Sequence, residues 1–244
     1  TPTEGWKAVP SLADTLKGPQ INKKNGKINH QSDMAIYNAM IAPLTPLSVR
    51  GFIWYQGESN RGQHALYRDR MEALIRGWRT VFQNDSAPFY FVQLAPFNYN
   101  NAPTLLPAIQ DTQRLAAETI PHTGMAVTTD IGNLKNIHPG NKGEVGRRLS
   151  LLALANTYGQ KDTAKISNAP LPKAALVSDH DTSDEVTVTF TNSTKLQVTS
   201  GDAPLHFELA GKDDKFFPAE AKIDGSKVIL RSEEVPSPRK VRYL

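Results

Sequence analysis

The sequence predicts an α/β fold, in which helices cover both faces of a parallel sheet and a small β-rich module follows. Between residues 49 and 158, short apolar runs alternate three times with longer amphipathic stretches, as in right-handed crossovers around a parallel sheet. After about residue 164 the pattern changes to short alternating runs separated by turn residues. We therefore expect an irregular lead-in over 1–33, an α/β core over 34–163 and the β-rich module over 164–244.

The elements of the α/β core follow from run length and periodicity. Short runs rich in β-branched and aromatic residues predict buried strands, whereas apolar steps of three and four predict helices. The predicted strands are 49–55, 89–94 and 125–129, and the predicted helices are 64–82, 104–119 and 141–158. A shorter helical pattern starts at Met34 and ends before Pro43. Ligands bind beyond the carboxyl ends of parallel strands, so the site is expected at 56–60, 94–98 and 130–138.

The β-rich module is predicted from four alternating runs. These are 186–190, 195–198, 206–209 and 228–230. The segments 199–202 and 224–226 contain the Gly, Asp and Ser residues that favour turns.

Composition removes several classes of function. The chain has no cysteine, which excludes thiol catalysis, disulfides and cysteine-based zinc sites. Its net charge of +4 comes from scattered basic residues, a distribution that argues against nucleic-acid binding. No apolar run reaches the length of about 18 residues that a transmembrane helix needs, and no His-Glu-x-x-His pattern indicates a metal. We expect no cofactor.

The amino-terminal segment carries no recognisable signal peptide. It opens on a loop-like stretch, 1–5, rather than on methionine. We expect an excised or processed piece of a longer secreted or periplasmic protein.

The first polar cluster, 54–60, follows the first predicted strand. It contains Trp54, Gln56, Gly57, Glu58 and Asn60. Backbone N–H groups and the Gln56 amide in such a turn can converge on a developing negative oxygen. The alternative is an ordinary strand-to-helix turn, in which a side chain, Ser59 or Asn60, caps the helix that follows.

The second polar cluster, 136–142, lies between the third predicted strand and the third helix. Here Pro139 follows His138 directly, and a helix begins just after it. The imidazole is therefore held at the edge of the sheet, which a general base requires. The alternative is a surface histidine in a loop.

Together these clusters resemble the sialate O-acetylesterase branch of the SGNH hydrolases, a family of serine esterases. The matching stretches are 37–44, 51–60, 93–97, 130–132, 137–149, 207–211 and 217–221. The resemblance implies a three-layer, flavodoxin-like hydrolase domain. It also implies removal of O-acetyl groups from sugars, typically sialic acid, through an acyl-enzyme formed by a serine and a histidine.

The resemblance assigns roles by position. His138 is the general base and then the general acid, Gln56 and Gly57 donate to the oxyanion, and Glu58 and Asn60 support them. Trp54, with other aromatic residues near the strand ends (Tyr55, Phe97 and Tyr99), either stacks on a sugar or belongs to the core. A cation near the site would pair with the sugar carboxylate, and the candidates are Arg50, Arg61 and Lys135.

The chain departs from the family pattern in two places. The nucleophile of the family lies in a Gly-Gln-Ser-Asn-Met-like motif after the first strand, and nothing in this sequence matches it. Ser11, Ser32 and Ser48 lack the glycine and the preceding strand, and Ser59 lies within the first polar cluster. We expect another segment or a second chain to supply this serine, and this chain alone to be inactive. Lys135 occupies the position three residues before His138 where such enzymes place an aspartate. Asp130 or a backbone carbonyl would then orient the imidazole.

Two other functions stay open at this point. The same layout would serve an acetylxylan-type polysaccharide deacetylase. The missing serine is also compatible with a non-catalytic carbohydrate-binding protein that keeps the esterase fold.

Overall fold

The computed structural model describes residues 3–15, 26, 28, 32, 34–99, 102, 104–160, 163, 169–178 and 184–243. Much of the predicted lead-in over 1–33, and residue 164 at the predicted boundary, lie outside these residues. The contacts divide the chain into two compact units, 1–168 and 169–244.

A three-stranded parallel sheet forms the centre of the first unit. Its strands are β1 (Phe52–Trp54), β2 (Phe89–Val92) and β3 (Thr123–Ala126), in the order β1-β2-β3. The predicted parallel α/β arrangement is confirmed. The third strand lies at 123–126 rather than 125–129, since the carbonyl of Val127 leaves the sheet and accepts a hydrogen bond from Arg148.

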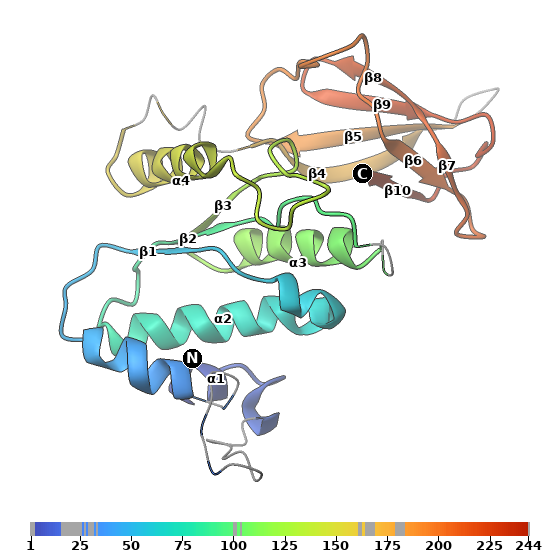
Figure 1. The fold of residues 1–244 in the computed structure, drawn as a ribbon. Helices are drawn as coiled ribbons and strands as arrows, with labels where there is room; N and C mark the ends of the chain where they lie inside the picture. The colour runs from blue at the N-terminus through green and yellow to red at the C-terminus, as the bar shows by residue number, and fades with distance from the viewer. Residues whose placement is uncertain are drawn as a thin grey trace. The chain divides into compact units, whose positions relative to one another are not determined.

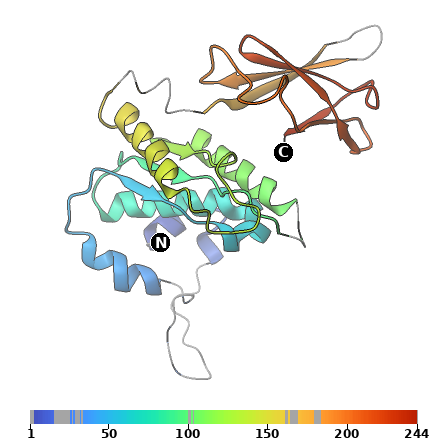
Figure 2. The ribbon, with the colours of Figure 1, turned by 45° about the horizontal axis from the view of Figure 1, so that its top comes forward.

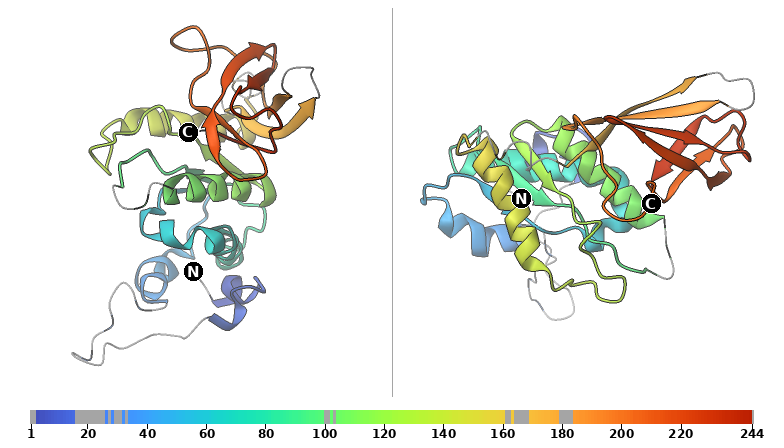
Figure 3. Two further views of the ribbon diagram at one scale, coloured as in Figure 1. Left: turned by 90° about the vertical axis from the view of Figure 1, so that its right-hand side faces the viewer. Right: turned by 90° about the horizontal axis from the view of Figure 1, so that it is seen from above.

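Helices cover both faces of this sheet. α2 (His64–Val81) and α3 (Leu105–Thr119) lie on one face and α4 (Lys142–Asn156) on the other, as Figure 1 and the left view of Figure 3 show. Figure 2 shows α4, in yellow, running across the strands. Successive β2 side chains follow this division, because Phe89 meets Trp78 of α2 whereas Tyr90 packs on Leu152 of α4. All four residues of β2 are buried.

The segments before β1 add short helices to this unit. α1 (Thr3–Lys7), which the sequence did not predict, packs on α2. The predicted helix after Met34 is present as a π-helical turn, η2 (Tyr37–Ile41), followed by the 3₁₀ turn η3 (Ala42–Leu44). The 3₁₀ turn η1 (Ala13–Thr15) follows α1.

The second unit is β-rich, as predicted. One antiparallel sheet has the order β4-β5-β9-β8, from β4 (Leu171–Ser178), β5 (Glu185–Thr191), β8 (Glu220–Asp224) and β9 (Lys227–Arg231). The other has the order β10-β6-β7, from β6 (Phe207–Ala210), β7 (Phe216–Pro218) and β10 (Lys240–Tyr243).

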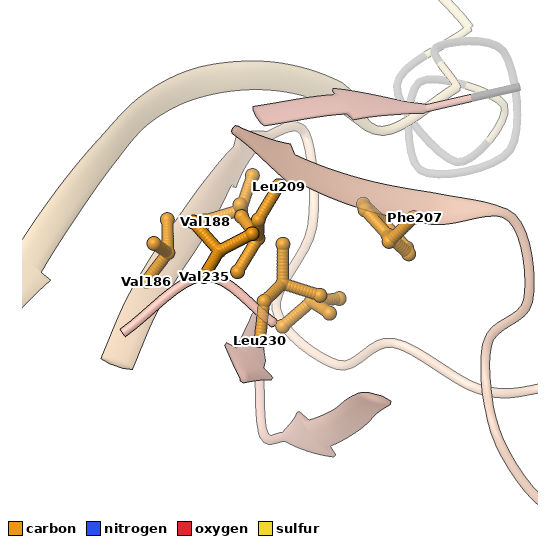
Figure 4. Packing of buried hydrophobic residues seen from close by; sticks show 7 residues of the cluster. Val186, Val188, Phe207, Leu209, Leu230 and Val235 are labelled. Carbon is orange, nitrogen blue, oxygen red and sulfur yellow. The ribbon is translucent and has the colours of Figure 1, made fainter. Parts of the chain in front are cut away.

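The core of the second unit is apolar, and Figure 4 shows its packing. The labelled residues are Val186, Val188, Phe207, Leu209, Leu230 and Val235. The strand predicted at 195–198 is wrong. Only Leu196 of that segment packs on the core, and its N–H donates to the Gly225 carbonyl outside any strand.

Candidate active site

The loops that follow the three parallel strands meet at one edge of the sheet. The Asn98 N–H donates to the Leu134 carbonyl at 3.0 Å, which joins the loop after β2 to the loop after β3. Gly132 lies so close to Pro96 that a Cβ atom there would come within 2.9 Å of the proline nitrogen. A glycine at 132 is therefore what permits the two loops to approach.

The turn that follows β1 contacts the neighbouring loops through two cation–π interactions. The Arg61 guanidinium, from the turn η4 (Glu58–Gln63), lies 3.3 Å from the centre of the Tyr99 ring beyond β2. The Lys142 ammonium, at the start of α4, lies 4.7 Å from the centre of the Tyr55 ring. Tyr55 precedes Gln56 directly, and Lys142 follows His138 by four residues. The Gln56 turn and the His138 loop therefore border each other.

The orientation of the Gln56–Gly57 peptide is fixed from the core side. The Tyr67 hydroxyl donates to the Gln56 carbonyl at 2.8 Å. Burial raises the pKa of Tyr67 to about 12, so this hydroxyl remains a donor at any physiological pH. In a trans peptide the N–H points opposite to the carbonyl, so the Gly57 N–H points away from Tyr67.

Gly57 has a backbone that other residues rarely adopt. Its φ is 149°, and a Cβ atom would lie 3.1 Å from the Tyr67 hydroxyl and 3.3 Å from a Leu94 methyl group. Both the conformation and the space favour glycine here.

Both predicted oxyanion donors have partners within the turn. The Gln56 amide nitrogen donates to Asn60 Oδ1 at 2.7 Å, and the Gly57 N–H donates to Glu58 Oε2 at 3.1 Å. Gln56 keeps a second N–H on the same nitrogen. A ligand oxygen at Gly57, in contrast, must replace the Glu58 carboxylate. The alternative role of Ser59 or Asn60 as a helix cap is wrong, since neither η4 nor α2 has a side-chain cap hydrogen bond.

The His138 loop is fixed through its backbone. The His138 N–H donates to Asn136 Oδ1 at 2.9 Å, Pro139 is buried, and the Asn141 side chain caps α4 by accepting from the Glu144 N–H. The His138 side chain is exposed, and no described residue hydrogen-bonds its imidazole. The imidazole is thus free to meet a nucleophile and a substrate.

Arg148 ties both ends of this loop together. Its guanidinium donates two hydrogen bonds of 2.6 Å to Asp130, one of 2.8 Å to Glu144 and one of 2.7 Å to the Val127 carbonyl. Hydrogen bonds from Arg148 lower the pKa of Asp130, and those from Arg147 and Arg148 lower the pKa of Glu144 to about 2. The Asp130 carboxylate is therefore ionised and engaged by Arg148, while its role as the acid partner of His138 stays a prediction.

Other residues that the sequence singled out lie apart from this cluster. Arg50 precedes β1, at the opposite end of the strand from Gln56, and lies 6.0 Å from the ring of Tyr158. The Ser11 hydroxyl donates to Asp69, and Ser59 is exposed in the turn η4.

An apolar cavity of about 280 Å³ lies beside the Gln56 turn. Its lining combines the three tryptophans of the chain with aliphatic, tyrosine and polar side chains: Trp6, Trp54, Trp78, Ile36, Tyr37, Ile41, Met71, Leu74, Tyr67, Arg70, Gln56 and Asn60. Trp54 faces Trp78 with ring centres 5.9 Å apart, so it belongs to the wall of this cavity. Among the described strands β1 pairs with β2 alone, and Ile53 on β1 is 69% exposed.

Sequence reasoning missed Arg148, Tyr67 and the stacking of Arg61 on Tyr99. Spacing of four residues on a helix could have paired Glu144 with Arg148. The partners of Tyr67 and Arg61 are distant in sequence and carry no local signal. Within the described residues, no group of three histidine, aspartate or glutamate side chains could hold a metal ion. No helix in that same part of the chain combines the length and apolar character needed to cross a membrane.

Comparison with known proteins places this site in a family. The profile of carbohydrate esterases described as sialic acid-specific acetylesterases matches residues 20–154, which include both the Gln56 turn and the His138 loop. The chain belongs to this family. Sialate O-acetylesterase from Rattus norvegicus is 35% identical over 156 residues, covering 57% of this chain and 28% of the rat protein. The Homo sapiens sialate O-acetylesterase is 32% identical over 197 residues, covering 71% of this chain and 36% of the human protein.

A solved structure of a carbohydrate acetylesterase is similar to this chain in fold. The crystal structure of a carbohydrate acetylesterase from Xanthomonas citri superposes with a TM-score of 0.77 at 39% sequence identity. The match covers 85% of this chain and 48% of that protein. The chain thus spans about a third of the curated acetylesterases that it matches and about half of the Xanthomonas enzyme.

Proposed function

We propose that this chain forms part of a carbohydrate O-acetylesterase that removes O-acetyl groups from sialic acid. The observation that carries the proposal is the contact of Lys142 with Tyr55. This contact joins the start of α4, just after the His138 loop, to the residue before Gln56, which supports a site where a base and amide donors act on one acetyl ester. The names of the rat and human relatives support sialic acid as the sugar.

The reaction uses these groups in two half-steps. A serine oxygen attacks the acetyl carbonyl carbon while His138 accepts the serine proton, and the Gln56 and Gly57 N–H groups donate to the negative oxygen. The intermediate collapses, the C–O bond to the sugar breaks, and the sugar oxygen takes the proton from His138. Water then attacks the acetyl-enzyme with the same proton transfers, releasing acetate and restoring the serine. For the Gly57 N–H to donate, the Glu58 carboxylate must leave it.

The serine is proposed to come from outside these residues, on a strand that lies along the open edge of β1. Two observations support this position. Ile53 and the cavity beside Gln56 offer an apolar surface along that edge, and parallel strands end at the same side of a sheet, so such a strand would deliver its serine next to Gln56. The relatives give no support to a separate second chain as its source.

The test is hydrolysis of p-nitrophenyl acetate and of O-acetylated sialic acid by the full-length gene product. His138→Ala is expected to lower kcat by roughly 10⁴-fold or more, since the members of a triad act as a unit. His122→Asn, which replaces a histidine at the opposite end of the sheet and tolerates its positive φ, is the matched control and should retain activity. Equal rates for the wild-type protein and His138→Ala would remove His138 from the mechanism.

The same assay separates the remaining alternatives. Turnover of acetylated xylan in preference to acetylated sialic acid would indicate the polysaccharide deacetylase, and sugar binding without turnover would indicate a carbohydrate-binding protein. The secreted or periplasmic location stays a prediction, which fractionation of the source cells would measure.

A further inference from the structure

Three cations beside the Gln56 turn, Arg61, Arg70 and Lys142, form no ion pair with an acidic side chain among the described residues, and Arg70 is already bound to the Gln63 side chain. Five arginines on the helices around the site form ion pairs with aspartate or glutamate: Arg68, Arg76, Arg114, Arg147 and Arg148. Two others on α2 bind neutral acceptors, since Arg70 donates to the Gln63 side chain and Arg79 to backbone carbonyls. Arg61 and Lys142 form no ion pair within the part of the chain that the structure describes, and each lies over a tyrosine ring instead. Their charges are therefore available to an anion.

The orientation of the Arg61 guanidinium is fixed before any ligand binds. The guanidinium lies 3.3 Å from the centre of the Tyr99 ring, and its Nε donates to the Glu58 carbonyl at 3.2 Å. Its Nη1 atom is buried without an acceptor among the described residues. A buried donor without a partner is unfavourable, so an acceptor brought by a ligand is favoured here. Because stacking and the Nε bond fix the plane of the group, little side-chain entropy remains to be lost on binding.

Lys142 contacts the same turn. Its ammonium is over Tyr55, which directly precedes Gln56, whereas Arg61 follows Gln56 by five residues. The nearby Glu58 carboxylate neutralises neither cation by direct pairing, since it accepts from the Gly57 N–H. Both positive charges thus lie beside the turn that carries the amide donors.

We propose that Arg61, assisted by Lys142, binds the carboxylate of an acidic O-acetylated sugar and so selects acidic over neutral substrates. A guanidinium fork matches the two oxygens of a carboxylate. The inference rests on the proposed function and adds a specificity-determining residue to it. Of the three cations that the sequence suggested, Arg50 lies at the opposite end of β1, and Lys135 is exposed in a loop without a ring contact among the described residues.

The test measures binding, independently of hydrolysis. The probes are N-acetylneuraminic acid and its carboxamide, titrated by calorimetry or NMR into the full-length gene product. We expect the wild-type protein to bind the acid about tenfold more tightly than the amide, which corresponds to about 1.4 kcal/mol. Arg61→Gln should reduce this ratio to twofold or less, Arg61→Lys should keep part of it, and Lys142→Gln should reduce it two- to threefold. Arg76→Gln, which removes an exposed arginine paired with Glu72, is the control and should leave the ratio unchanged.

Three outcomes would overturn the inference. They are equal binding of acid and amide by the wild-type protein, an unchanged ratio in Arg61→Gln, and an equal loss of both probes in Arg61→Gln, which would mark Arg61 as structural. Hydrolysis of the O-acetylated forms separates this inference from the proposed function. If neither acetylated sugar is hydrolysed but the acid still binds preferentially through Arg61, the esterase proposal fails and the carboxylate site stands.

Discussion

The two loops that build the site are held in different ways. The His138 loop, between β3 and α4, is anchored by one arginine that binds two carboxylates and a carbonyl. The Gln56 turn, after β1, is held by neutral hydrogen bonds of Tyr67 and Asn60, by hydrogen bonds that Glu58 accepts, and by the absence of a side chain at Gly57. Charge-assisted bonds are about twice as strong as neutral ones, whereas a glycine acts through shape. The first loop should therefore respond mainly to the loss of charged partners, whereas the second should respond most strongly to the size of the side chain at position 57.

Among changes to the residues that hold the two loops, adding one methyl group to the turn should have the largest effect. Gly57→Ala places a Cβ against Tyr67 and Leu94 and forces a backbone conformation that alanine avoids. The Gly57 N–H then loses its alignment, and removal of one oxyanion donor lowers kcat by roughly 10²- to 10³-fold. The measurement is steady-state hydrolysis of p-nitrophenyl acetate by the full-length gene product. Wild-type kcat in Gly57→Ala would remove this N–H from the oxyanion site.

A smaller effect is expected from removing the Arg148 guanidinium, which holds the His138 loop. Arg148→Gln releases Asp130, Glu144 and the Val127 carbonyl without touching substrate. The expected result is a kcat about tenfold lower at nearly constant KM, because a mispositioned base affects the chemical step more than binding. Arg147→Gln, which loses only the neighbouring Glu144 pair, serves as the control. A pure change in KM would show that Arg148 does not position His138.

The neutral hydrogen bond within the turn should matter less. Asn60→Ala removes the acceptor of the Gln56 amide, and a bond of this kind contributes about 0.5–1.5 kcal/mol. We expect kcat to fall about three- to tenfold, with the fall restored in part by Asn60→Asp, which keeps an acceptor oxygen. If Asn60→Asp is as impaired as Asn60→Ala, the acceptor is not what positions Gln56.

The His138 loop should contribute to the loss of stability in acid. The pKa of Glu144 is lowered from 4.5 to about 2, and that of Asp130 is lowered as well. Groups whose pKa is depressed on folding contribute stability fully above their unfolded pKa, and this stability is lost as the pH falls through the folded pKa. The melting temperature of the wild-type protein should therefore fall between about pH 4.5 and pH 2, and Glu144→Gln should flatten this fall by a few degrees. If the wild-type protein and Glu144→Gln show the same dependence of melting temperature on pH, Glu144 is not a source of the acid sensitivity.

The sequence predicted the helices and strands of the first unit more accurately than it predicted the side-chain contacts that support the site. Apolar spacing predicted the ends of α2 and α3 within a residue or two, because the buried face of an amphipathic helix appears in the sequence as apolar residues at steps of three and four. It missed β4, whose residues are almost all exposed, since an exposed edge strand has no buried face to detect. The Gln56 turn and the His138 loop were found as polar clusters after strands. Their supports, the bond of Asp130 to Arg148 and the stacking of Arg61 on Tyr99, depend on residues that only folding brings together.

The cavity beside Gln56 also makes the protein its own optical reporter. The chain has three tryptophans, one each from α1, β1 and α2, and all of them line this one hollow. Whatever enters or leaves it, whether a polypeptide segment or solvent, changes the polarity around each indole at once. Tryptophan fluorescence should therefore report on the environment of this cavity, next to the amide donors, without any attached dye.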